Sequence, residues 1–194
     1  MKVLSRILAV TAAACIGSAS AASFGLNTIY TGATPSSPAP WLNALVTDTA
    51  TGVDIVFTAP GLTGTEFVSD WGFQLTAGAA PVLSSPGTLP ATQLQVALNA
   101  INGPGSSSIN PYNDLVFNFE NSNSSVNRFQ GGETFAVSLT GISEAHFLGS
   151  GAHIQGLVNG QSGKAHSVPE PSSALASLFV LGVGGLLLRR RKSV

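Results

Sequence analysis

The chain has 194 residues, of which only 9% are charged, and its formal net charge at pH 7 is −1. Six of the eight Lys and Arg residues lie at the two ends, so the stretch from Ser23 to Val168 holds two basic and eight acidic residues, a formal charge of −6. An acidic stretch cannot assemble the basic patch that neutralises phosphates, so nucleic-acid binding is disfavoured.

Residues 1–21 have the composition of a secretory signal peptide. Lys2 and Arg6 form a positive region, Ile7 to Ile16 is an apolar stretch, and Ala19-Ser20-Ala21 is a small-residue cleavage site. We therefore expect an N-terminal signal helix, export of the chain, and removal of residues 1–21 by signal peptidase.

Cys15 is the only cysteine and lies inside this signal. The exported body, residues 22–167, can therefore form no disulfide and must be held by its apolar core, for which a domain of this size is sufficient. Acylation of Cys15, as in a lipoprotein, is the alternative, but Ala12 and Ile16 fit the usual lipoprotein pattern poorly.

The body is expected to be all-β because its apolar residues recur with a period of two. Leu42 to Val46 and Val53 to Phe57 alternate on either side of a turn at Asp48–Gly52, which predicts a hairpin. A short helix over residues 91–100 is the alternative to one of the further strands. Those further strands are predicted at residues 67–75, 94–98, 115–120, 135–140 and 154–158.

Loops rich in Pro, Gly, Ser and Asn separate these strands, for example at 34–40 and 102–105. This spacing is typical of an antiparallel β-sandwich or jelly-roll-like body. Five aromatic residues in the apolar register are expected between its two sheets. They are Trp71, Phe73, Phe117, Phe119 and Phe135.

Three histidines, His146, His153 and His166, are the candidate metal ligands, but their spacing matches no common zinc motif. Seven residues of extended chain span about 20 Å or more, so only a turn at Gly149–Gly151 would bring the first two together. We expect no metal or cofactor, and for His153 a structural role through a hydrogen bond to a neighbouring loop.

Two pairs of carboxylates are further candidates, one for calcium binding and one for catalysis. Asp48 and Asp54 flank a turn and offer oxygens to calcium, although no EF-hand spacing is present. Glu66 and Asp70 would be a glycosidase pair, but positions four apart on a strand lie about 13 Å apart. Because no Gly-x-Ser-x-Gly elbow marks a nucleophile either, we expect no enzymatic activity, with a secreted hydrolase as an alternative.

Trp41 is the residue that would stack on a sugar ring if the body were a carbohydrate-binding module. Trp71 lies in the apolar register expected for the core, whereas Trp41 follows Pro40 and is therefore the candidate stacking residue. An ice-binding function is a further alternative, but Thr-x-Thr occurs only at residues 47–51 and 63–65 and forms no regularly spaced array along the body.

The last 27 residues, 168–194, combine three signals in a fixed order. A motif of Val168, Pro169, Glu170 and Pro171 is expected to stay extended, because each proline disfavours helix at the residue before it. The apolar run Ser172 to Leu188 gives about 25 Å of transmembrane helix, close to the ~30 Å hydrocarbon core. The cations Arg189, Arg190, Arg191 and Lys192 place the C-terminus in the cytoplasm and the body on the export side.

This tail resembles the PEP-CTERM sorting signal of Gram-negative bacteria in the order of its motif, span and basic cluster. The resemblance implies recognition by an exosortase, a membrane-embedded cysteine transpeptidase-like enzyme that removes the tail as the protein reaches the surface or the extracellular matrix. A permanent anchor that is never cut is the alternative.

The sequence therefore predicts an exported, non-enzymatic surface or matrix protein, held transiently in the inner membrane and then found at the cell surface or outside. Its low charge and abundant Ser, Thr, Asn and Gly suit a soluble body among polysaccharides. The expected partners are the exosortase, signal peptidase, the membrane before processing, and the exopolysaccharide of a biofilm.

Overall fold

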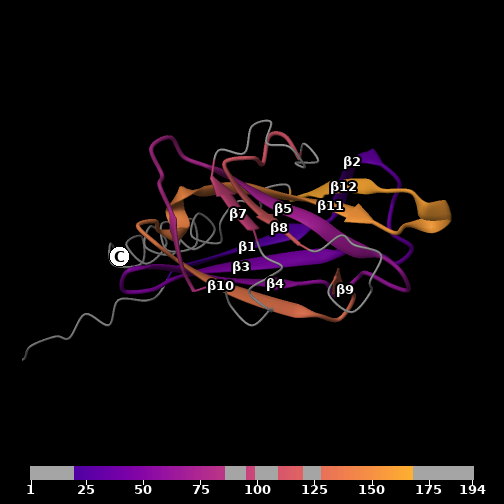
Figure 1. Cartoon of the computed structure of the whole chain (residues 1–194), viewed down its shortest axis with the longest axis horizontal. Helices are drawn as coiled ribbons and strands as arrows, with labels where there is room; N and C mark the ends of the chain where they lie inside the picture. The colour runs from indigo at the N-terminus through magenta and orange to yellow at the C-terminus, as the bar shows by residue number, and fades with distance from the viewer. Residues whose placement is uncertain (1–19, 86–94, 99–108, 120–127, 168–194) are drawn as a thin grey trace, which may run out of the picture.

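The computed structural model describes residues 20–85, 95–98, 109–119 and 128–167. Strands dominate these ranges, and their helical content consists of two 3-10 turns, η2 (Glu144–His146) and η3 (Val158–Gly160). The strands form two antiparallel sheets that lie in two layers (Figure 1). The all-β prediction is thereby confirmed.

The first sheet has five strands in the order β1-β3-β4-β10-β6. At its centre, β3 and β4 form the predicted hairpin, in which Val46 lies opposite Ile55. The turn is closed by Thr49, whose backbone N–H donates to the carbonyl of Gly52 at 2.8 Å. The strands are β1 (Ala21–Leu26), β3 (Leu42–Asp48), β4 (Gly52–Thr58), β10 (Thr134–Thr140) and β6 (Val82–Ser85).

The second sheet follows the order β2-β12-β11-β5-β8-β7, and β9 pairs with one end of β5. Its central strand, β5, has eight of nine residues buried. The strands are β2 (Thr28–Gly32), β12 (Gly163–His166), β11 (Phe147–Gln155), β5 (Phe67–Leu75), β8 (Leu115–Asn118), β7 (Gln95–Leu98) and β9 (Phe129–Gln130).

Aromatic side chains join the two sheets. The ring of Phe57, from β4, lies 4.9 Å from the ring of Trp71 and 5.1 Å from that of Phe117, both of the opposite sheet. Edge-to-face contacts of this kind stabilise a core by about 0.5–1.5 kcal/mol each beyond area burial. All five aromatic residues predicted for the interior belong to the core cluster.

The predicted register of β5 is wrong at one position. Unbroken alternation over the predicted strand 67–75 places Phe67, Ser69 and Trp71 on one face, but the register shifts so that Asp70 pairs with His153 and Val68 with Ile154. Ser69 is therefore the extra residue of a bulge, and Val68 joins Trp71 in the core cluster. The period of two cannot reveal such an insertion, because it assumes unbroken alternation.

Other differences concern strands with weak apolar patterns. The alternative helix over 91–100 is wrong for its described part, since β7 is a strand that pairs with β8. The last predicted strand, 154–158, overlaps β11 only at residues 154–155, and Val158 begins η3 instead. Strands β1, β2, β6, β9 and β12 were not predicted.

The predicted signal helix and transmembrane helix fall in residues 1–21 and 172–188, which lie almost wholly outside the described ranges. Ala21, the last residue assigned to the signal, is the first residue of β1. Within the ranges that the structure describes, no helix is both long and apolar enough to cross a membrane.

Candidate functional site

Ser167 follows β12 directly and precedes the predicted tail. Its backbone N–H donates to the carbonyl of Ser150 on β11 at 2.9 Å, and its hydroxyl accepts from the backbone N–H of Ser150 at 3.1 Å. Only 2% of Ser167 is exposed. The chain is thus bound to the fold up to the residue that precedes Val168.

Ser150 connects this boundary to the core. Its hydroxyl accepts a hydrogen bond from the indole N–H of Trp71 at 2.7 Å and donates to the carbonyl of Gly72 at 3.2 Å. Both Ser150 and Trp71 are fully buried. Ser167 is therefore held by a hydrogen-bond network that runs through Ser150 to Trp71, the largest side chain of the core.

A tyrosine covers the outer face of the second sheet next to this boundary. A Cβ on Gly151 would lie 2.4 Å from the ring of Tyr112, and one on Gly72 would lie 1.9 Å from the Tyr112 carbonyl oxygen. The ring fits only because these strand positions are glycine. The phenol of Tyr112 lies 2.9 Å from Nδ1 of His166, at the end of β12.

Tyr30, on the edge strand β2, completes this aromatic group. Its ring meets that of His166 edge-on at 5.3 Å between centroids, and 38% of the residue is exposed. Burial raises the pKa of Tyr30 to about 12, with a further contribution from Tyr112. Burial also raises the pKa of Tyr112. Both phenols are neutral donors at physiological pH, which suits packing and hydrogen bonding.

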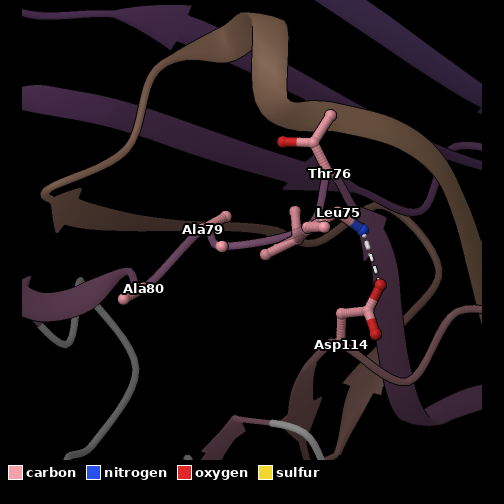
Figure 2. A pocket seen from close by; sticks show the side chains of 7 residues that line it. Leu75, Thr76, Ala79, Ala80 and Asp114 are labelled. Atoms are coloured by element: carbon pink, nitrogen blue, oxygen red, sulfur yellow. Dashed lines mark hydrogen bonds between the residues drawn. The ribbon is translucent and has the colours of Figure 1, made fainter.

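A shallow hollow of about 160 Å³ lies beside the end of β5 (Figure 2). The carboxylate of Asp114 borders it and accepts a hydrogen bond from the backbone N–H of Leu75 at 2.8 Å. The remaining lining residues are Thr76, Ala77, Gly78, Ala79 and Ala80. One carboxylate already used to hold a strand end, with no second ionisable lining group, does not form an acid–base pair.

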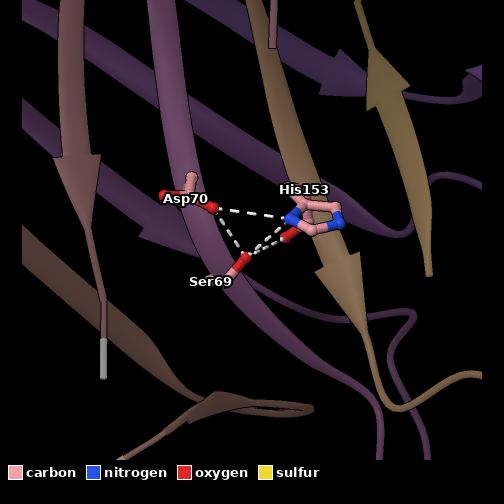
Figure 3. A network of polar contacts seen from close by, with 3 residues as sticks. All are labelled: Ser69, Asp70 and His153. Atoms are coloured by element: carbon pink, nitrogen blue, oxygen red, sulfur yellow. Dashed lines mark hydrogen bonds and ion pairs between the residues drawn. The ribbon is translucent and has the colours of Figure 1, made fainter. Parts of the chain in front are cut away.

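Ser69, Asp70 and His153 form a polar cluster between β5 and β11 (Figure 3). The Ser69 hydroxyl donates to Oδ2 of Asp70 at 2.7 Å and lies 2.9 Å from Nδ1 of His153, while Asp70 Oδ2 is 3.4 Å from the same nitrogen. A catalytic triad needs the serine and the carboxylate on opposite ring nitrogens. Here both meet Nδ1, so the arrangement orients the imidazole without activating the serine.

The three histidines are held apart by different partners. His146 lies 2.9 Å from the Ser143 hydroxyl, while His153 and His166 bond the groups described above. Across the described ranges, no three His, Cys, Asp or Glu side chains group as metal ligands. The structural role predicted for His153 is confirmed, but its partners lie on a strand rather than a loop.

The candidate carboxylates also serve the fold. Oδ1 of Asp48 accepts from the backbone N–H of Glu144 at 2.7 Å, and Oδ1 of Asp54 accepts from the Ser138 hydroxyl at 2.6 Å. They therefore have separate partners.

Glu66 joins two loops. Its carboxylate accepts from the backbone N–H groups of Ser36 and Thr63, each at 2.8 Å. Burial works to raise the pKa of Glu66, but these hydrogen bonds outweigh it and lower the pKa. A carboxylate held in this way is a poor proton donor.

The sugar-stacking role suggested for Trp41 is wrong. Only 6% of Trp41 is exposed, and its indole N–H donates to the carbonyl of Ser37 at 2.8 Å. The preceding loop folds back so that the ring joins the core cluster. A buried ring has no free face for a sugar, so Trp41 is a core residue.

The comparison with known families bears on the tail. The family model of the PEP-CTERM protein-sorting motif matches residues 167–192. The chain carries a PEP-CTERM sorting signal. The PEP-CTERM match spans the predicted motif Val168, Pro169, Glu170 and Pro171 and the basic cluster Arg189 to Lys192. It begins at Ser167, which is hydrogen-bonded to Ser150 of the body.

The PEP-CTERM signal identifies the chain as a substrate of exosortase sorting, directed toward the cell envelope or surface. No curated protein and no solved structure matches the chain. The identification therefore concerns the tail, whereas the role of the body has to be argued from its own residues.

Proposed function

We propose that this chain is a non-enzymatic surface or matrix protein of a Gram-negative bacterium, which an exosortase releases from a transient inner-membrane anchor. The main support is the sorting-signal match, which begins at Ser167. Ser167 is only 2% exposed and is hydrogen-bonded to Ser150 of β11, so the matched segment follows directly on residues that are packed in the fold.

The spacing of the tail also supports processing close to the membrane. Five peptide bonds separate Ser167 from Ser172, where the expected span begins. A fully extended chain of that length reaches about 17 Å, so the body would stand next to the bilayer until the tail is cut. The Pro-Glu-Pro motif lies within this short connection.

The absence of enzymatic activity is proposed from the way polar side chains are used. Glu66 holds two loops, Asp114 holds a strand end, and Ser69 shares one ring nitrogen with Asp70. A catalytic group must instead present a proton or lone pair to a substrate. In the described part of the body, the strongest candidates are committed to structure.

Association with exopolysaccharide is supported by the outer face of the five-stranded sheet. This hydroxyl face is defined by residues of β3, β4 and β10 whose side chains alternate with core positions. Asp54 is its one charged member, and hydroxyl and amide groups match the hydrogen-bonding groups of a glycan. Its members are Asn43, Leu45, Thr47, Asp54, Val56, Thr58, Thr134, Ala136, Ser138 and Thr140.

Processing is tested by replacing Pro169, Glu170 and Pro171 with alanine in the full chain, in a host that contains the exosortase. We expect the variant to stay in the membrane fraction with its basic end intact, while the wild type is released with a C-terminus near the motif. Pro60→Ala, at an exposed proline of the body, is the matched control and should be processed normally. Equal release of both variants would contradict the proposal.

Polysaccharide association is tested with two exposed leucines on opposite sheets. Leu45, 40% exposed, lies on the hydroxyl face, and Leu148, 45% exposed, lies on β11. Leu45→Glu should reduce retention of the processed protein on isolated exopolysaccharide, and Leu148→Glu should not. Equal retention of both would remove the hydroxyl face from the proposal.

A carbohydrate-binding module remains the second candidate because one aromatic ring is accessible. Tyr30 exposes 38% of its surface, whereas both tryptophans are buried. Tyr30→Leu keeps the apolar bulk and removes the stacking ring. Loss of binding to short soluble oligosaccharides in this variant favours the module, and unchanged retention on whole polysaccharide favours the broad hydroxyl face.

A further inference from the structure

Ser20, which precedes β1, is part of the folded body. Its carbonyl accepts a hydrogen bond from the backbone N–H of Asp48 at 2.9 Å, and its hydroxyl donates to Oε2 of Glu144 at 2.8 Å. Ala21 follows as the first residue of β1 and pairs with Thr47. The fold thus includes contacts of Ser20 and Ala21, the two residues before Ala22, where the sequence pattern places the mature N-terminus.

The Glu144 carboxylate contacts Ser20 directly, and the Asp48 carboxylate contacts the backbone of Glu144. Glu144 begins η2, and its backbone N–H donates to Oδ1 of Asp48 at 2.7 Å. The same Asp48 donates its own N–H to Ser20, and Glu144 accepts the Ser20 hydroxyl. The end of β3 and the start of η2 therefore form an acidic contact site for Ser20.

We propose that signal peptidase cuts between Ala19 and Ser20. Gly17-Ser18-Ala19 offers small residues at the two positions that the protease reads, as Ala19-Ser20-Ala21 does. A cut after Ala21 would remove both hydrogen bonds of Ser20 and the first pair of β1. A cut after Ala19 keeps them, so the folded structure distinguishes two sites that the sequence pattern leaves equivalent.

Cleavage would itself add an interaction at this acidic contact site, because it creates a new charged group on Ser20. Hydrolysis adds one water across the Ala19–Ser20 amide, leaving a carboxylate on Ala19 and, at neutral pH, an ammonium on Ser20. That ammonium is attached to the same Cα as the hydroxymethyl group that bonds Glu144. The Glu144 carboxylate near this ammonium favours a charge-assisted hydrogen bond, which is stronger than a neutral one.

The test begins with the N-terminus of the exported protein. The full chain is produced in an exporting bacterium, and the released product is analysed by intact mass and N-terminal sequencing. A product that starts at Ser20 is expected, and one that starts at Ala22 overturns the inference. A product that still starts at Met1 overturns the export signal itself, a failure distinct from that of exosortase processing at the other end.

Two matched substitutions separate the cleavage registers. Gly17→Phe places a bulky side chain at the third position before the proposed cut and should block or shift it. Ala21→Phe places the same side chain on an exposed residue after the cut and should leave cleavage unchanged. The opposite pattern, with Ala21→Phe blocked and Gly17→Phe cut normally, overturns the assignment.

The acidic contact site is tested by the substitution Glu144→Gln in the exported product. Glutamine keeps an acceptor for the Ser20 hydroxyl but removes the charge that faces the ammonium. We expect a melting temperature roughly 2–4 °C lower in dilute salt, with a smaller difference in concentrated salt because screening weakens ion pairs. An identical melting temperature in dilute salt overturns the proposed ammonium contact.

Discussion

Replacing Ser150 with alanine is expected to destabilise the body by about 1–3 kcal/mol. Ser150 is fully buried, and its hydroxyl is the acceptor for the indole N–H of Trp71 at 2.7 Å. Alanine nearly preserves the packing but leaves this N–H without an acceptor in the core. A buried donor that loses its partner keeps its full desolvation penalty, which exceeds the net value of an ordinary hydrogen bond.

The assay is thermal and denaturant unfolding of the processed protein. For a domain of this size, the expected loss lowers the melting temperature by roughly 2–12 °C. Ser23→Ala is the matched control, because the Ser23 hydroxyl bonds the Asn43 side chain at the surface. Its effect should stay within about 0.5 kcal/mol.

A double-mutant cycle identifies the cause of the loss. Trp71→Phe removes the indole N–H, so Ser150→Ala should destabilise this background by less than it destabilises the wild type. An equal loss in both backgrounds would refute the role of the hydrogen bond. A Ser150→Ala protein that unfolds like the wild type would refute the reasoning altogether.

Three other changes test the core and two ionisable groups. Phe57→Ala should lower the free energy of unfolding by about 3–5 kcal/mol in denaturant titrations, because its ring contacts aromatic residues of both sheets. Glu66 has a lowered folded pKa because hydrogen bonds outweigh the opposing effect of burial. It therefore stabilises the fold above its unfolded pKa, and this stability is lost as pH falls through the folded value, so Glu66→Gln should flatten the acid side of the melting curve against pH. Tyr30, whose pKa burial raises to about 12, should ionise late in an ultraviolet titration, and stability should fall between pH 10 and 12 because the unfolded chain releases its proton first.

Each of these expectations has a result that contradicts it. A Phe57→Ala protein with nearly wild-type stability would mean that neighbouring rings close the space. Parallel acid limbs for Glu66→Gln and the wild type would remove the carboxylate from the acid response. For the tyrosine, Tyr30→Phe is the control, and the ultraviolet titration should lose its latest phase in that variant.

The sequence predicted the strands whose one face enters the core. In β3, β4 and β10 every second residue is apolar, and the structure buries this alternating set in each strand. Strand β12 escaped prediction because Gly163-Lys164-Ala165-His166 contains only one side chain that joins the core cluster. Strand β1 escaped because four of its six residues are Ala, Ser or Gly, which leaves Phe24 and Leu26 as its only large apolar side chains.

Some of the site residues could also be predicted from the sequence, whereas others could not. The PEP-CTERM signal is a linear pattern, so the order of residues sufficed to find it. The burial of Trp41 depends on a loop that returns to accept its indole N–H at Ser37, which no periodicity encodes. The pairing of Tyr112 with His166 joins residues 54 positions apart and relies on glycines of neighbouring strands.

Hydrogen-bonding groups on the hydroxyl face are spread over a wide surface and are not gathered at one point. An enzyme concentrates its function in a few side chains, so one substitution abolishes activity. The hydroxyl face instead spreads hydrogen-bonding groups over three strands, with Asn43, Thr58 and Thr134 in one register row. Because each contact with a polysaccharide would be weak and repeated, single alanine substitutions on this face should each reduce retention slightly, while combined ones should reduce it in proportion. Complete loss of retention from a single alanine would instead indicate one discrete binding pocket and would count against a distributed surface.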